Sequence, residues 1–180
     1  SIMSGFSQME SLPSSFENHV REMLFESKQS HEYSPYEQYC DGYPDWADKS
    51  NTGKVNTLEN NTGWKFLQGG GVVQGELFGG CMEVLVMIKA TELWPKSEFW
   101  NGKIFLLETS EEKPSIHEVD HVLRNYGAQG IFNRIIGLIL GRARDYSAEE
   151  KLQLEETIVS IVAKEFGKPD LPIVVNMDFG

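Results

Sequence analysis

Glu108 is the residue whose type and position in the chain best suit it to chemistry. It ends the apolar run Ile104-Phe105-Leu106-Leu107, which follows Gly102. Such a run predicts a short strand buried on both faces, and a carboxylate at its carboxyl end is costly without a partner. Because α/β proteins place their reactive groups in the crevice outside the carboxyl ends of strands, Glu108 is a candidate catalytic residue. The alternative is that Glu108 or a neighbour caps the helix that follows.

Two histidines have the spacing of metal ligands. His117 and His121 are four residues apart, so on a helix both rings would lie on one face. The chain has no HExxH pattern, and the sequence offers no third ligand close to both. A solvated polar helix face therefore explains the pair better than a metal hydrolase does, and we expect neither a metal nor another cofactor.

The two cysteines, Cys40 and Cys81, lie in unlike contexts without CxxC spacing. They therefore imply neither a zinc site nor a disulfide scaffold, and a reducing, cytoplasmic location fits best. The first five residues, 1–5, have no basic or strongly apolar region, so they predict no secretory signal.

Composition excludes two classes of partner. The 180 residues are 40% hydrophobic and 24% charged, as is ordinary for a globular protein. The net charge of −11 would repel a phosphate backbone, so nucleic acid is not expected as the main partner. No apolar run reaches the roughly 18 residues of a membrane span, so no membrane partner is expected either.

The elements that must position Glu108 follow from the periodicity of the sequence. After an amphipathic helix over 14–27, a long polar segment over 29–61 contains five aromatic residues. These rings either pack the segment onto its neighbour or line a ligand site. The five rings are Tyr33, Tyr36, Tyr39, Tyr43 and Trp46.

The second half alternates strands with helices. Short Gly-broken strands over 63–81 precede a helix from Met82 to about Ala90, in which Val84, Leu85, Met87 and Ile88 are expected to face a core. Strands over 103–108, 135–142 and 171–178 are separated by helices over 115–126, ended by Gly127 and Gly130, and 147–166. This order predicts an α/β fold with parallel strands, flanking helices and right-handed connections. Parallel strands would bring Glu108, Arg142 and the tail Asp178-Phe179-Gly180 to one edge.

Four segments of this half resemble the C-terminal domain of the LD-carboxypeptidase family of serine peptidases. That family includes muramoyltetrapeptide carboxypeptidases, and the microcin C immunity proteins are the branch that the chain resembles most. The matching segments are Gly75-Glu76-Leu77-Phe78-Gly79-Gly80-Cys81, residues 104–114, Gly137-Leu138-Ile139-Leu140-Gly141-Arg142 and Asn176-Met177-Asp178-Phe179-Gly180.

The resemblance implies a domain division and a fold. Residues 63–180 would form a small swivelling β/β/α-type C-terminal domain. Residues 1–28 resemble the closing passage of the family's N-terminal nucleophile domain, and residues 29–62 would connect the two.

The resemblance also implies a mechanism and site residues. A nucleophilic serine, a histidine base and a glutamate would cleave an amide next to a free carboxylate, and Glu108 matches the glutamate. The family histidine directly follows D-F-G, and the family serine lies upstream of the matching region, so this chain would supply only the glutamate. Cys81 stands where the family usually has asparagine near the substrate. Lys113 and Trp46 could contact substrate as a positive and a stacking group.

We therefore expect a fragment of a cytoplasmic serine carboxypeptidase, inactive alone and homodimeric by family precedent. Its substrate would be a murein tetrapeptide, as in peptidoglycan recycling, or a microcin-like aminoacyl-nucleotide conjugate. The aromatic segment favours the conjugate, because rings stack on a base. The alternative is a non-catalytic α/β binding module, in which Glu108 would bond only to backbone N–H groups of the next helix.

Overall fold

The computed structural model describes residues 13–179, and contacts within the chain divide it into two units, Ser1–Gly63 and Trp64–Gly180. Residues 1–12 and Gly180 lie outside the described residues. The expected passage over 1–28 is therefore described only in part, and the tail only as far as Phe179. Among residues 13–179, no helix combines the length and apolarity needed to cross a bilayer.

The first unit contains one helix and a small sheet. Helix α2 (Ser14–Leu24) follows Pro13, and no side chain caps its start. Strand β1 (Gln38–Cys40) pairs antiparallel with β2 (Leu58–Asn60), and the 3₁₀ turn η1 (Lys49–Asn51) lies between them in the chain. The polar segment is therefore partly ordered by a two-stranded ladder.

Most of the aromatic residues of this segment pack within the first unit. The ring of Tyr33 lies edge-on to that of His19 in α2, with centroids 5.1 Å apart, and the ring of Tyr36 lies 6.5 Å from that of Phe16. Of the two alternatives for these rings, packing therefore describes Tyr33 and Tyr36. Trp46 differs, because it stays 55% exposed beside Tyr43.

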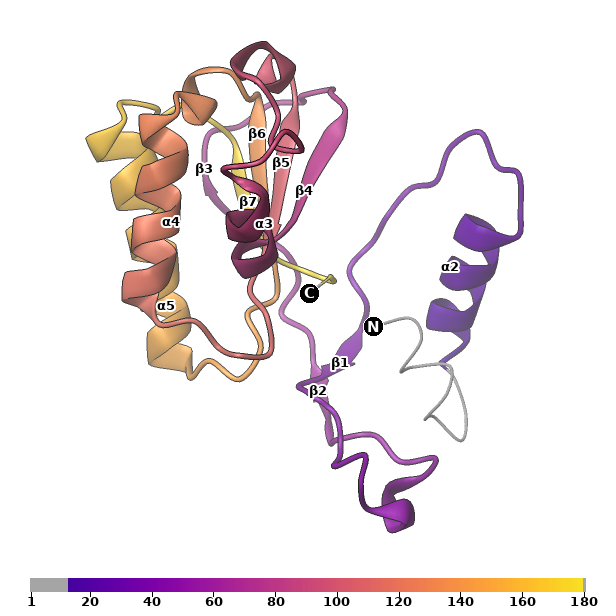
Figure 1. Ribbon diagram of the computed structural model, residues 1–180. Helices are drawn as coiled ribbons and strands as arrows, with labels where there is room; N and C mark the ends of the chain where they lie inside the picture. Colours follow the sequence, from indigo (N-terminus) through magenta and orange to yellow (C-terminus); the bar gives the residue numbers. More distant parts are fainter. Residues whose placement is uncertain (1–12, 180) are drawn as a thin grey trace. The chain divides into compact units, whose positions relative to one another are not determined.

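The second unit is built on a five-stranded sheet (Figure 1). Its strands lie in the order β3-β7-β6-β5-β4, and all neighbours are parallel except β3, which runs antiparallel to β7. The expected parallel arrangement of the three later strands is confirmed, and β4 extends it by one strand. The bounds are β3 (Lys65–Gln68), β4 (Leu77–Cys81), β5 (Ile104–Glu108), β6 (Gly137–Gly141) and β7 (Ile173–Met177).

Three helices cover one face of this sheet. Strands β4, β5, β6 and β7 lie side by side in the order in which they follow one another in the chain, so each right-handed connection places its helix on the same face. They are α3 (Met82–Ile88), α4 (Ile116–Ala128) and α5 (Ala148–Val159), the last continuing into the π-helical segment η4 (Ser160–Glu165). Phe105 and Leu107 of β5 are fully buried under them, whereas Leu106 between the two is only half-buried. The expectation of strands buried on both faces is therefore wrong, because helices cover only one.

Local signals set the helix ends. Ser115 caps α4 and Ser147 caps α5, each in a reciprocal capping box with the glutamate three residues on. Helix α4 runs through Gly127, which was expected to end it, and the left-handed residue after the helix is Gly130, with φ 75°.

Helix α3 also differs from its expected pattern. Met82 and Leu85 are its buried residues, whereas Val84 is 55% and Met87 is 74% exposed. The expectation that Val84 and Met87 face the core is therefore wrong. The helix is only seven residues long and borders the edge strand β4, so few of its positions can reach the core.

Candidate functional site

The carboxyl ends of the four parallel strands meet at one edge of the sheet. Cys81, the last residue of β4, lies opposite Glu108, the last residue of β5, and Gly141 of β6 lies opposite Met177 of β7. Arg142 and Asp178 directly follow these last two residues. The sheet topology therefore gathers the segments that the sequence placed at one edge.

Glu108 is half-buried at this edge. Within residues 13–179 no hydrogen bond to its carboxylate is found, and helix α4 is capped by Ser115 and Glu118. The alternative in which Glu108 caps that helix is therefore wrong. Burial raises the pKa of Glu108 above its usual value, and the nearby negative charges of Glu83 and Glu111 raise it further. An ionised Glu108 is thus poorly compensated by the residues described and would be stabilised by a cation.

Cys81 is the cross-strand neighbour of Glu108 and the residue before α3. Its thiol is free, as is that of Cys40, and its Sγ lies 3.4 Å from Oε2 of Glu83. Burial raises the pKa of the Cys81 thiol, so the residue is mostly protonated at neutral pH. A neutral thiol beside Glu108 adds no further negative charge to the site.

Gly79, the first of the two glycines before Cys81, allows β4 to approach β5 closely. A Cβ atom on Gly79 would lie 1.6 Å from the carbonyl oxygen of Leu106, and the φ of Gly79 is 156°. No side chain fits there without moving one of the two strands. Gly79 therefore serves the close contact between the two strands.

The other two predicted contact residues have different surroundings. Nζ of Lys113 lies 2.9 Å from Glu150 in the first turn of α5 and 5.6 Å from the ring centre of Tyr146. Lys113 is thus held by α5, with its side chain 38% exposed. Trp46 belongs to the first unit. Contact of Lys113, Trp46 or Cys81 with a substrate stays a prediction.

A polar network that sequence reasoning missed holds the end of β7. A guanidinium nitrogen of Arg142 lies 2.6 Å from Oδ1 of Asp178, and the two side chains are only 13% and 10% exposed. The indole N–H of Trp64 donates to Oδ2 of Asp178 at 3.1 Å, and Arg142 also donates to Asn176. The D-F-G pattern placed Asp178 at the edge, but no local signal pairs it with Trp64, 114 positions away.

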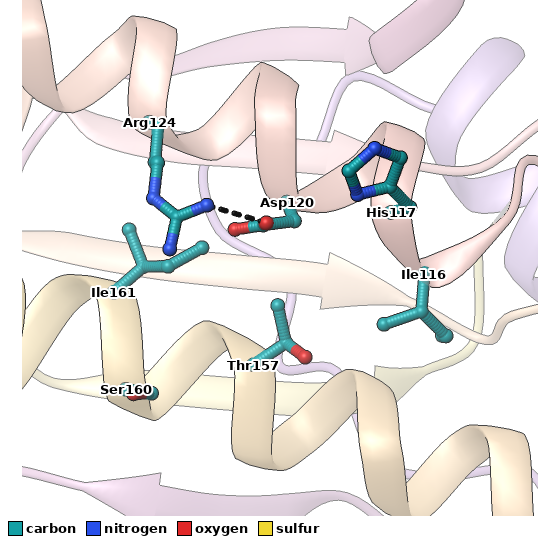
Figure 2. Close-up of a pocket in the computed structure, with 7 residues that line it drawn as sticks. All are labelled: Ile116, His117, Asp120, Arg124, Thr157, Ser160 and Ile161. Atoms are coloured by element: carbon teal, nitrogen blue, oxygen red, sulfur yellow. Dashed lines mark hydrogen bonds and ion pairs between the residues drawn. The ribbon is translucent and has the colours of Figure 1, made fainter.

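The histidine pair lies on the helical layer. The rings of His117 and His121 are 4.0 Å apart, and residues 13–179 contain no cluster of three or more potential metal ligands. His117 lines a surface hollow of about 360 Å³ between α4 and α5, where Arg124 binds Asp120 at 2.5 Å (Figure 2). The hollow is lined by α4, α5 and η4, whereas Glu108 ends β5.

Comparison with known proteins decides the family. The sequence profile of the LD-carboxypeptidase C-terminal domain matches residues 74–180. The chain belongs to the LD-carboxypeptidase family. The family and its C-terminal domain, expected from the four segments, are thereby confirmed, and no curated protein sequence gave a significant match.

Solved structures agree with this LD-carboxypeptidase fold. The MccF-like protein from Streptococcus pneumoniae in complex with AMP is 28% identical, with a TM-score of 0.81 over 96% of this chain and 51% of that one. The microcin C7 self-immunity protein MccF, in complex with aspartyl sulfamoyl adenosine, is 22% identical, with a TM-score of 0.74 over 95% and 48%. The MccF-like protein from Bacillus anthracis is 22% identical, with a TM-score of 0.60 over 82% and 41%. At such low identity the last two show the fold alone.

The chain thus spans about half the length of these relatives. The four segments that resembled the LD-carboxypeptidase family are the ones that form β4, β5, β6 and β7 and their carboxyl ends. The mixed α/β fold, with its mostly parallel sheet and flanking helices, is therefore as expected for this family.

Proposed function

We propose that this chain is the C-terminal domain of a serine LD-carboxypeptidase-like hydrolase, with Glu108 as the acidic member of a Ser-His-Glu triad. The observation that carries the proposal is the place of Glu108 in a matched LD-carboxypeptidase domain, half-buried at the carboxyl edge of the sheet. A glutamate so placed would accept the imidazole N–H and hold the ring in the tautomer that removes a proton from serine.

The electrostatics of the site support this role. Burial and two neighbouring carboxylates raise the pKa of Glu108, so its negative charge lacks compensation until a cation approaches. An imidazolium formed during serine attack is such a cation. Glu108 would therefore interact more strongly with the histidine in the transition state than before it, as catalysis requires.

The remaining members of the triad would come from other parts of the protein. By family pattern the serine lies in the N-terminal domain and the histidine follows Gly180.

The proposed substrate carries an amide next to a free carboxylate. It is a murein tetrapeptide or, preferably, an aminoacyl-nucleotide conjugate. The preference is supported by the Streptococcus pneumoniae relative, whose structure is a complex with AMP, and by the exposed ring of Trp46, which could stack on a base. We also propose a cytoplasmic, homodimeric enzyme.

A chimera tests this function. Residues 29–180 of this chain, which include Trp46, would replace the corresponding part of the Streptococcus pneumoniae MccF-like protein, with that protein's own residues on both sides. Hydrolysis of aspartyl sulfamoyl adenosine and of a murein tetrapeptide would be followed by chromatography. We expect the chimera to be active, preferably on the conjugate, and its Glu108→Gln variant to lose at least about 10³-fold in kcat.

The matched control is Glu112→Gln, which removes an exposed carboxylate four residues further on. It should keep kcat within about threefold. A folded, active chimera that keeps its rate after Glu108→Gln would refute the triad role. A folded chimera that binds the conjugate without hydrolysing it, even with Glu108 intact, would favour the alternative of a non-catalytic binding module.

A further inference from the structure

Glu83 connects the two strand ends at which the site lies. It belongs to the first turn of α3, two residues after Cys81. Its Oε1 accepts hydrogen bonds from the backbone N–H of Ser110 at 3.1 Å and from the Ser110 hydroxyl at 2.6 Å. Ser110 lies two residues after Glu108, so one carboxylate oxygen ties the start of α3 to the turn that leaves β5.

The second oxygen of Glu83 reaches the other neighbour of Glu108. Its Oε2 lies 3.4 Å from Sγ of Cys81, which is the cross-strand partner of Glu108. Glu83 is therefore bonded on both sides of Glu108, along the chain through Ser110 and across the sheet through Cys81. Any shift of Glu83 would move both.

Two buried hydroxyls lie near this contact, one of them in the apolar core. Tyr126 of α4 is fully buried, and its hydroxyl has no hydrogen-bond partner among the residues described. Burial is the main cause that raises the pKa of Tyr126, and the acidic groups of Cys81 and Glu83 nearby raise it further, so its hydroxyl stays protonated. The Thr109 hydroxyl is also buried without a partner in residues 13–179.

The charge of Glu83 has both a local use and a cost. An acidic residue in the first turn of a helix is stabilised by the helix dipole, and charge-assisted bonds to Ser110 are stronger than neutral ones. A second carboxylate near Glu108 is unfavourable, however, when both are ionised. A neutral amide at position 83 could accept the same bonds without that repulsion, so the charge itself has a consequence for Glu108.

We propose that Glu83 is a positioning residue. It holds the turn at Ser110 so that Glu108 stays fixed at the end of β5, and it adds a second negative charge where a triad histidine would become a cation. The catalytic meaning of this role rests on the proposed function. The coupling between Glu83 and Glu108 can be measured in the 180-residue chain alone.

Carbon-detected NMR titration of the glutamate side chains would test the coupling. The Glu108 signal would be assigned by its loss in Glu108→Gln. In Glu83→Gln, which keeps an acceptor for Ser110, we expect the pKa of Glu108 to fall because a like charge is gone. In Glu83→Ala, we also expect amide exchange at Ser110 to accelerate about tenfold, the factor that corresponds to 1.4 kcal/mol.

The control variant Glu92→Gln removes an exposed carboxylate from the turn after α3 and should change neither readout. A purely structural role for Glu83 would lower thermal stability without moving the pKa of Glu108. An unchanged pKa in Glu83→Gln, or unchanged Ser110 exchange in Glu83→Ala, would overturn the proposal.

The catalytic part is tested in the chimera, separately from the proposed function. There, Glu83→Ala should lower kcat about tenfold with little change in KM, and Glu83→Gln should recover part of the loss. Full kcat in Glu83→Ala would overturn the positioning role while leaving the triad role of Glu108 intact. Loss of the triad role would instead appear as activity that survives Glu108→Gln.

Discussion

The pair formed by Arg142 and Asp178 should be the charge contact whose removal most destabilises the second unit. The variant Arg142→Met keeps most of the side-chain volume but leaves Asp178, only 10% exposed, with a negative charge that has lost its guanidinium. Breaking a buried ion pair from one side typically costs about 3–5 kcal/mol. Because the indole N–H of Trp64 still donates to Asp178, we expect the lower part of this range, about 3 kcal/mol.

A loss of that size is readily measured. For a domain of this size it corresponds to a fall in Tm of roughly 10 °C. Urea unfolding followed by circular dichroism gives the free energy of unfolding, and tryptophan fluorescence reports the surroundings of Trp64. The matched control is Arg124→Met, since Arg124 is 48% exposed in its pairs with Asp120 and Glu165 and should cost less than about 1 kcal/mol.

A double-mutant cycle decides whether the pair itself is responsible. The double variant Arg142→Met with Asp178→Asn leaves no uncompensated charge. Its loss in the free energy of unfolding should therefore be smaller than the sum of the two single losses by at least about 1 kcal/mol. Additive losses, or a cost of Arg142→Met no larger than that of Arg124→Met, would refute the reasoning.

Two further predictions concern Glu108 and the glycines beside it. Burial raises the pKa of Glu108 in the folded protein above the ordinary glutamate value of 4.5. The folded state therefore binds the carboxyl proton more tightly than the unfolded state does, and the protein loses stability as the pH rises from 4.5 through the raised pKa. Glu108→Gln should therefore be more stable than the wild type at pH 7, with the advantage vanishing near pH 4 in urea titrations. A variant less stable at pH 7 would contradict this. Gly79→Ala should cost at least about 3 kcal/mol, because its Cβ would meet the Leu106 carbonyl at 1.6 Å. The control is Gly80→Ala, because a Cβ on Gly80 would meet nothing within 4 Å. It should lower the free energy of unfolding by only about 1–2 kcal/mol, the cost of an alanine at a φ of 149°. Equal losses of stability in the two variants, measured by thermal unfolding, would count against the close approach of Gly79 to Leu106.

Local sequence patterns determined much of the second unit. The capping boxes at Ser115 and Ser147 were readable as helix starts, because their bonds join residues three apart. The apolar run before Glu108 was enough to place a strand there with a carboxylate at its end. The alternation of strands and helices then fixed which strand ends share an edge, since parallel strands joined by right-handed connections leave few other arrangements.

Only the tertiary structure decided what surrounds Glu108. The partners of Asp178 come from positions 36 and 114 residues away, and the bond from Ser110 to Glu83 spans 27. Such contacts depend on strand register and on how each helix packs, which no local pattern encodes. For the same reason the burial of β5 was overestimated. The sequence of an apolar strand is the same whether helices cover one face of its sheet or both faces. Only the folded chain shows that α3, α4 and α5 all lie on one face of this sheet.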